Sequence, residues 1–202
     1  MSRAISIETI IESTLDGIDE SIKFYQEWSG GEWLWNAPEY FITVKIAENI
    51  AKINGAKYIT LEDNVKYVLD LAQQKGKGQA SEKARANGRS DIVLWYGNEK
   101  PRAIVEVKNA VFRIKNILED IERIQDVLEK FTLQFGLIAF YMDRHYEKGN
   151  ANQKVEENIH KIFEEIKEQY PKMICELYFR KSQIIGEDTD AFSSVVILFK
   201  GK

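Results

Sequence analysis

The chain has 202 residues, of which 44% are hydrophobic and 30% are charged, an ordinary balance for a globular protein. This length suffices for one well-buried domain and is short for two, so we expect a single domain over residues 1–202. No run of about 18 apolar residues occurs, so no membrane span is expected. One cysteine, Cys175, excludes an internal disulfide and favours a cytoplasmic protein, and one Cys with two His argues against a zinc site.

Residues 1–36 are expected to form an N-terminal helical extension. Apolar residues recur at helical spacing over residues 5–27, and Gly17 is expected to interrupt that helix. Gly30-Gly31 is a break, around which three of the four tryptophans cluster: Trp28, Trp33 and Trp35. We expect this cluster to lie in the core; base stacking and contact with a partner are the alternatives.

Residues 37–143 are expected to form the core of the domain. Asn36-Ala37-Pro38-Glu39 is expected to open a helix, with Pro38 near the first helical position, and the helix runs to about Ile53. Lys57–Leu61 is a short strand candidate, and Thr60-Leu61-Glu62-Asp63 has the pattern of a capped helix start, with the helix continuing through Gln74. Lys75–Gly88 reads as a loop, mobile without a ligand.

A β-hairpin follows this loop. The apolar runs Asp91–Tyr96 and Arg102–Lys108 flank Gly97-Asn98-Glu99-Lys100, which is typical of a turn. If that tetrapeptide is the turn, Tyr96 faces Pro101 and Asp91 faces Glu106.

The rest of the chain alternates helices and strands. We expect a helix at Ile114–Phe131, a buried strand at Gly136–Met142 and a polar loop at Asp143–Ala151. Residues 144–202 are expected to extend the core with a helix at Asn152–Tyr170 and two strands, Ile174–Phe179 and Ser194–Phe199. The pattern predicts an α/β fold with a central mixed sheet flanked by helices.

The hairpin register places charged side chains together. Side chains directly opposite on an antiparallel pair share a face, so Asp91 and Glu106 converge at the open end, and Lys108 lies two residues further on the same face. Facing carboxylates repel each other, and a divalent cation between them removes that cost. Hard carboxylate oxygens suit Mg²⁺ or Mn²⁺.

This Asp and Glu-x-Lys pattern resembles the restriction-endonuclease-like nucleases, the PD-(D/E)xK superfamily, over the hairpin and most of residues 38–143. Ser90 stands where the family name has Pro. The resemblance implies an αβββαβ core, metal binding by Asp91, Glu106 and the Val107 carbonyl, and a water-directing role for Lys108. It also implies a further acid from the first core helix. Glu39 is the choice and Glu48 the alternative.

The charge distribution supports a polyanionic substrate. The chain carries a net charge of −4, but residues 75–115 contain ten Lys or Arg against four acids, so this segment is +6 and the remainder −10. Arg85 and Arg89 precede Asp91 and are the first candidates for phosphate contacts. Arg123 is a third candidate, with an intrahelical pair to Asp120 as the equally weighted alternative.

The sequence therefore predicts a magnesium- or manganese-dependent nuclease that hydrolyses phosphodiester bonds, with DNA as the expected substrate. The alternative is a non-catalytic nuclease-fold module that binds nucleic acid or a protein partner. A small-molecule enzyme has no supporting motif. Whether the chain forms a homodimer is left open.

Overall fold

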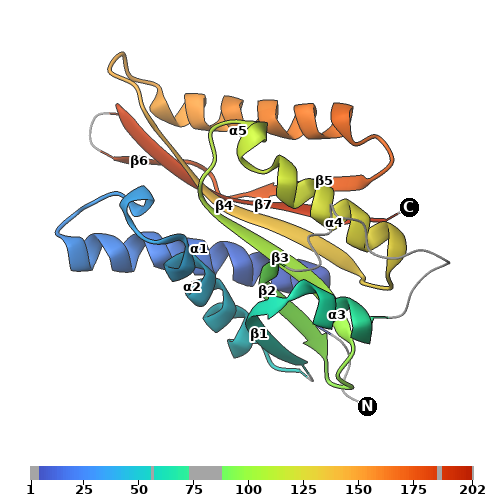
Figure 1. Ribbon diagram of the computed structural model, residues 1–202. Helices are drawn as coiled ribbons and strands as arrows, with labels where there is room; N and C mark the ends of the chain where they lie inside the picture. The colour runs from blue at the N-terminus through green and yellow to red at the C-terminus, as the bar shows by residue number, and fades with distance from the viewer. Residues whose placement is uncertain (1–4, 56, 73–87, 186–187, 202) are drawn as a thin grey trace.

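The computed structural model describes residues 5–55, 57–72, 88–185 and 188–201. The helices are α1 (Ile7–Ser29), α2 (Glu39–Lys52), α3 (Val65–Leu71), α4 (Leu118–Lys130) and α5 (Ala151–Gln169), with short 3₁₀ helices η1 (Leu34–Asn36) and η3 (Ile114–Asn116). The strands are β1 (Lys57–Asn64), β2 (Arg89–Tyr96), β3 (Pro101–Ala110), β4 (Phe135–His145), β5 (Ile174–Phe179), β6 (Gln183–Ile185) and β7 (Asp190–Lys200). The protein is thus an α/β fold (Figure 1).

All these strands belong to one mixed sheet in the order β1-β2-β3-β4-β7-β5, with β6 pairing with β7. The pairs β1–β2 and β2–β3 are antiparallel, whereas β3 and β4 are parallel. A parallel pair needs a crossover connection, and α4 provides it between β3 and β4. The C-terminal strand β7 then continues the sheet antiparallel to β4.

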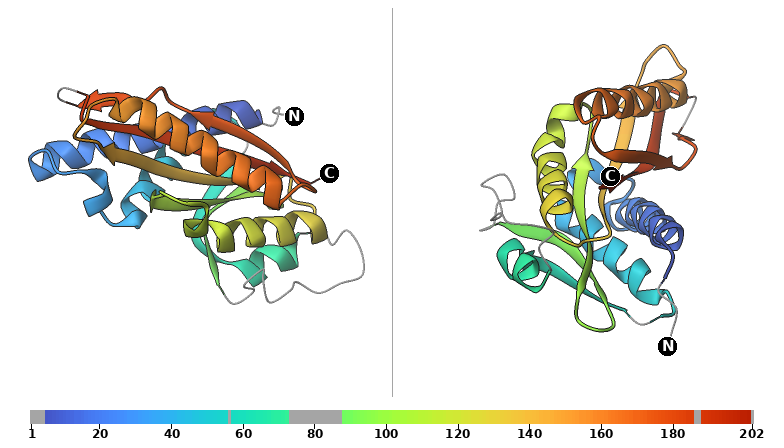
Figure 2. Two further views of the ribbon diagram at one scale, coloured as in Figure 1. Left: turned by 90° about the horizontal axis from the view of Figure 1, so that it is seen from above. Right: turned by 90° about the vertical axis from the view of Figure 1, so that its right-hand side faces the viewer.

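The two faces of the sheet are covered by different helices (Figures 1 and 2). One apolar layer packs α1 and α2 against alternate residues of the central strands, such as Leu94, Val105 and Leu137. The other layer packs α3, α4 and α5 against the intervening residues, such as Val93, Ile104 and Ile138. Because β3 and β4 are buried on both faces, they read as near-continuous apolar runs.

Gly17 does not interrupt α1, contrary to the prediction. The helix continues to Ser29, where Gly30 ends it in a left-handed conformation (φ 76°). Gly17 is instead a contact point, because a Cβ atom there would lie 2.5 Å from the Ile46 Cα of α2. The absent side chain allows the two helix backbones to approach closely.

The predicted helix start at Thr60–Asp63 is also wrong. These residues belong to β1, and the helix begins at Val65, where the Asn64 side chain accepts a hydrogen bond from the Tyr67 N–H. Thr60 contributes to the sheet, since its Oγ1 accepts a 2.7 Å hydrogen bond from Trp95 Nε1. The last two residues of the predicted helix, 73 and 74, and most of the Lys75–Gly88 loop lie outside the described residues.

The tryptophan cluster lies in the core only in part, since Trp33 packs against the core and Trp28 and Trp35 are exposed. The Trp28 side chain is 67% exposed and that of Trp35 51% exposed, and Trp33 is half-buried. Trp28 contacts Phe41, with ring centroids 5.1 Å apart, but turns most of its surface to solvent.

The C-terminal elements differ from the prediction mainly in length. β4 continues through Asp143 to His145, which shortens the expected polar loop, and β7 begins at Asp190 rather than Ser194. The short strand β6 was not predicted, so three strands rather than two follow α5. Within the described residues, no helix combines the length and apolarity that a membrane span requires.

The Gly17 contact gives a test of the packing. Replacing Gly by Ala inside a helix ordinarily stabilises it by about 1 kcal/mol. We expect Gly17→Ala instead to lower the free energy of unfolding by about 1–3 kcal/mol, because the new methyl group meets the Ile46 backbone. Urea denaturation, with the half-buried Ser13→Ala on the same helix as the control, measures this. Stabilisation by Gly17→Ala would show that the helices are further apart.

Candidate active site

The candidate site lies where the β2–β3 ladder ends. Ile92 pairs with Val105, Val93 with Ile104 and Leu94 with Ala103, which is the predicted register and places Asp91 next to Glu106. The register shifts between Leu94 and Trp95, so Trp95, not Tyr96, faces Pro101. This irregularity lies near the turn and leaves the other end of the hairpin as predicted.

Asp91 lies at the open end, half-buried. Its Oδ2 accepts a 2.7 Å hydrogen bond from the Val107 N–H, so the carboxylate takes the place of a strand partner. Burial raises the pKa of Asp91, although the Val107 hydrogen bond and the Lys108 charge oppose the shift. In a β-strand the N–H and C=O of one residue point to the same side, so the Val107 carbonyl lies on the side of β3 from which the N–H binds Asp91.

Glu106 is 1% exposed and lies against α4. Its Oε2 is 2.7 Å from Arg123 Nη1. Its Oε1 is buried and accepts no hydrogen bond in the described part of the chain. Burial raises the pKa of Glu106 above its ordinary value, and the Arg123 guanidinium opposes that shift. One oxygen of this carboxylate is thus paired and the other is open to a ligand.

Lys108 lies on the same face, between two acids. Its Nζ is 3.3 Å from Asp120 Oδ2 and 3.6 Å from Glu39 Oε1. Burial acts to lower the pKa of this ammonium, but the neighbouring carboxylates, Asp120 and Glu39 foremost, outweigh it and raise the pKa. Lys108 is therefore a fixed positive charge in this site.

Helix α4 contributes Asp120 and Arg123, both buried and 3.5 Å apart. The intrahelical pair was the alternative given for Arg123, and it is present. The stronger Arg123 contact is with Glu106, which the sequence did not predict. Arg123 thus forms ion pairs with carboxylates within the protein, whereas a phosphate contact was the expected role. Asp120, as a partner of Lys108, is a site residue that the sequence analysis did not identify.

Glu39 reaches the site from the opposite layer. It is the first residue of α2, and its Oε2 accepts a 3.0 Å hydrogen bond from the Asn109 N–H while Oε1 approaches Lys108. Asn109 also donates from Nδ2 to the Ala37 carbonyl, at 2.6 Å, which fixes the start of α2 against β3. The alternative acid, Glu48, is exposed and pairs with Lys45 and Lys52, so it is not part of this site.

A polar cavity of about 340 Å³ lies between the hairpin end and α4, and its lining includes Asp91, Glu106, Lys108, Asp120 and Arg123. Arg89, the first residue of β2, lines it as well and is exposed. Arg85 lies outside the described residues. Of the residues proposed from sequence, Asp91, Glu106, Lys108, Arg89 and Arg123 therefore share one cavity, and Glu39 contacts it through Lys108.

The oxygen donors of this site suit a hard divalent cation, but they are few. In residues 5–55, 57–72, 88–185 and 188–201, no three His, Cys, Asp or Glu side chains are grouped so as to hold a metal ion. The protein offers two carboxylates, with Glu106 Oε1 unpartnered, and the Val107 carbonyl. Mg²⁺ usually keeps several waters and is bound by one or two carboxylates, so this smaller set matches its preference.

A second hollow, of about 620 Å³, lies beyond Asn109 and is lined by Trp33, Trp35, Phe112 and Asp143 among others. Burial raises the pKa of Asp143 to about 6; Arg144 opposes this shift and Asp190 adds to it. The buried Oδ1 of Asp143 has no hydrogen-bond partner in the described structure. This acid is therefore destabilised in its charged form.

No protein-family model, curated protein or solved structure matches this chain.

The Glu106–Arg123 pair is testable by a double-mutant cycle. Arg123→Met leaves Glu106 buried without its cation and should lower the free energy of unfolding by about 3 kcal/mol. Adding Glu106→Gln should restore most of that loss, because a neutral amide needs no cation. Lys130→Met removes a more exposed ion pair on the same helix and should cost at most about 1 kcal/mol. Additive losses from Arg123→Met and Glu106→Gln would contradict the pairing.

Asp143 gives a pH dependence. Its pKa in the folded protein, about 6, exceeds the ordinary value of 3.8. Between pH 3.8 and 6 the folded state therefore binds a proton at Asp143 that the unfolded state releases. Its contribution to stability is therefore greatest below about pH 4 and is lost as the pH rises through 6. Asp143→Asn should remove this decline and stabilise the protein at pH 7 by about 1 kcal/mol, after allowance for partial solvent screening. Thermal unfolding from pH 4 to 7, with the exposed Asp70→Asn as control, measures it; an unchanged slope would refute the assignment.

Proposed function

We propose that the chain is a metal-dependent nuclease of the PD-(D/E)xK type, with DNA as its expected substrate. The observation that carries the proposal is the buried Glu106 carboxylate, next to Asp91, with one unpartnered oxygen, in a cavity that also contains Lys108. The order of the described elements agrees with this, because α2, β1, β2, β3, α4 and β4 follow the family's αβββαβ arrangement, with α3 and η3 as additions among the described residues.

In this proposal Asp91, Glu106 Oε1 and the Val107 carbonyl would hold Mg²⁺ or Mn²⁺. A bound divalent cation supplies a water of lowered pKa and neutralises charge on the phosphate. The hydrogen bond from the Val107 N–H keeps the Asp91 carboxylate turned toward the backbone of β3. The Arg123 guanidinium holds the other oxygen of Glu106 and offsets the burial of its charge.

Lys108 acts in this proposal through its charge. Since the surrounding carboxylates keep it protonated, it orients the attacking water and stabilises the negative charge that develops on the phosphate, rather than accepting a proton. Glu39 and Asp120 are positioning residues, because they hold the Lys108 Nζ between them.

A specific observation also favours the alternative, a non-catalytic nuclease-fold module that binds nucleic acid or a protein. Arg123 pairs with Glu106, and Lys108 lies between Asp120 and Glu39, so both cations of the site have carboxylate partners within the protein and these contacts need no metal. A cleavage assay distinguishes the two functions, because only the nuclease cuts nucleic acid. A module of this kind binds its partner equally well with EDTA and leaves nucleic acid intact.

The experiment is incubation of the purified protein with duplex DNA, single-stranded DNA and RNA, in Mg²⁺, Mn²⁺ or EDTA. We expect cleavage only with metal. Asp91→Ala should abolish it and Lys108→Ala should lower the rate at least about a hundredfold, while circular dichroism shows an intact fold. Glu39→Ala should lower the rate about tenfold, as loss of a positioning residue does, and the matched Glu48→Ala should not.

Two results would overturn the proposal. One is cleavage by Asp91→Ala at the wild-type rate, which would place the activity elsewhere. The other is the absence of cleavage of every substrate by the wild-type protein in either metal, which would favour the binding module.

A further inference from the structure

A row of hollows leads away from the candidate active site across η3 to α5. The active-site cavity shares Lys115 and Asn116 with a hollow of about 470 Å³, which shares Phe112 and Arg113 with a third of about 290 Å³. The third shares Asn158 and Lys161 with a fourth of about 300 Å³, between α5 and the end of β4. The last three together form one continuous surface depression, which we call the η3–α5 groove.

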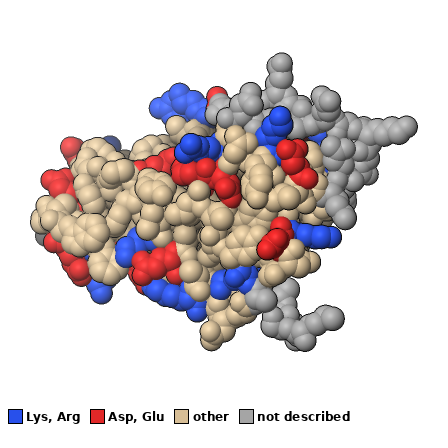
Figure 3. All heavy atoms as spheres, turned by 60° about the horizontal axis from the view of Figure 1, so that its bottom comes forward, with Lys and Arg blue, Asp and Glu red and all other residues tan. Residues whose placement is uncertain are grey.

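Basic side chains dominate this groove. Its lining contains five Lys or Arg against two Glu: Arg113, Lys115, Arg144, Lys154 and Lys161 against Glu157 and Glu165. The groove is thus +3 in a chain whose net charge is −4. The face shown in Figure 3 has acidic and basic side chains intermixed.

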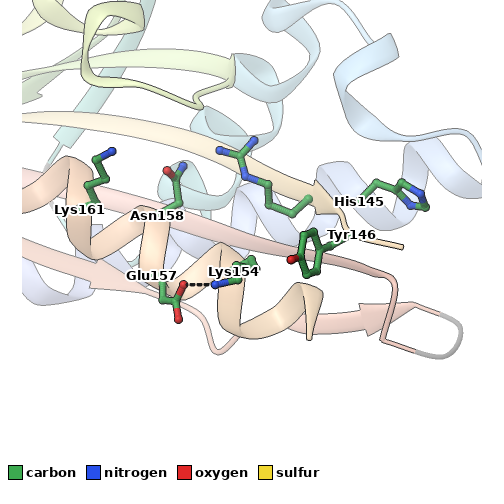
Figure 4. A pocket seen from close by; sticks show the side chains of 7 residues that line it. His145, Tyr146, Lys154, Glu157, Asn158 and Lys161 are labelled. Atoms are coloured by element: carbon green, nitrogen blue, oxygen red, sulfur yellow. Dashed lines mark hydrogen bonds and ion pairs between the residues drawn. The ribbon is translucent and has the colours of Figure 1, made fainter. Parts of the chain in front are cut away.

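The positive charges of the groove are largely uncompensated within the protein. Lys154 pairs with Glu157 at 2.7 Å, as the dashed line in Figure 4 shows. No ion pair in the described residues involves Arg113, Lys115, Arg144 or Lys161. In Figure 4, Asn158 and Lys161 rise from α5 on the side that faces β4. Exposed cations that lack internal partners are available to an external anion.

The Arg144 side chain is held in place within the groove by its contact with Phe112. Its guanidinium lies 4.8 Å from the centroid of the Phe112 ring and is half-buried. Burial lowers the pKa of Arg144; Asp143 opposes this shift, and the Arg113 charge adds to it. Arg113 and Arg144 also line the same hollow, so their like charges repel each other, and an anion bound in that hollow would relieve the repulsion.

We propose that the η3–α5 groove binds the sugar–phosphate backbone of a nucleic acid strand that continues from the active-site cavity. The inference rests on the proposed function, since that cavity is where the strand is cleaved. A continuous row of cations from Lys115 to Lys161 matches a ligand that repeats its negative charge along its length. Backbone contacts of this kind position the substrate without reading its sequence.

The test measures binding, not cleavage. All variants carry Asp91→Asn, so that a fluorescein-labelled DNA duplex stays intact, and anisotropy gives Kd over a series of NaCl concentrations. Arg113→Gln with Lys161→Gln removes two exposed charges of the groove. Lys52→Gln with Lys172→Gln removes the same charge from exposed positions outside it. Single-stranded DNA and RNA of equal length serve as further probes.

We expect the groove variant to bind every probe several-fold more weakly and to lower the slope of log K against log salt by about 2, near 1 for each lost phosphate contact. The control variant should match the Asp91→Asn parent. Equal affinity and slope for groove and control variants would overturn the inference, as would the absence of binding by the parent. Loss of affinity in the groove variant, in a protein whose wild type cleaves nothing, would support the groove and refute the nuclease.

Discussion

Glu106 is held in the interior by one cation, the Arg123 guanidinium 2.7 Å away, and the arrangement of the site depends on that contact. A buried carboxylate without a partner is costly, so the helix that carries Arg123 must pack at this point of the sheet. That helix is α4, the crossover that makes β3 and β4 parallel neighbours. The same placement puts Asp120 3.3 Å from Lys108. One ion pair thus couples the topology of the sheet to the geometry of the candidate active site.

The parts of the fold that follow from local chemistry could be predicted from the sequence. The turn at residues 97–100 and the apolar runs on either side indicate a hairpin whose register places Asp91 next to Glu106, although the pairing shifts by one residue beside the turn. Pro38 before Glu39 marks the start of α2, and the apolar run at 136–142 marks a strand buried on both faces. These signals lie within a few residues of the structure that they specify.

The parts that depend on tertiary packing could not be predicted. Gly17 looks like a helix breaker until the Ile46 backbone is placed against it. Trp28 and Trp35 resemble core residues, but their exposure depends on how the segment after α1 crosses the molecule. The contact between Arg123 and Glu106 joins a helix to a strand, and neither sequence position indicates the other. The η3–α5 groove likewise combines residues of the basic 75–115 segment with lysines of the acidic remainder.

The central claim is that Asp91 and Glu106 hold a divalent cation at the end of the hairpin. Anomalous diffraction from crystals of the wild-type protein soaked in Mn²⁺ tests it most directly, because the signal locates the ion independently of activity. We expect one anomalous peak between the Asp91 carboxylate and Glu106 Oε1, next to the Val107 carbonyl, with Arg123 still on Glu106 Oε2. The absence of a peak there at saturating Mn²⁺, with Glu106 held only by Arg123, would contradict it.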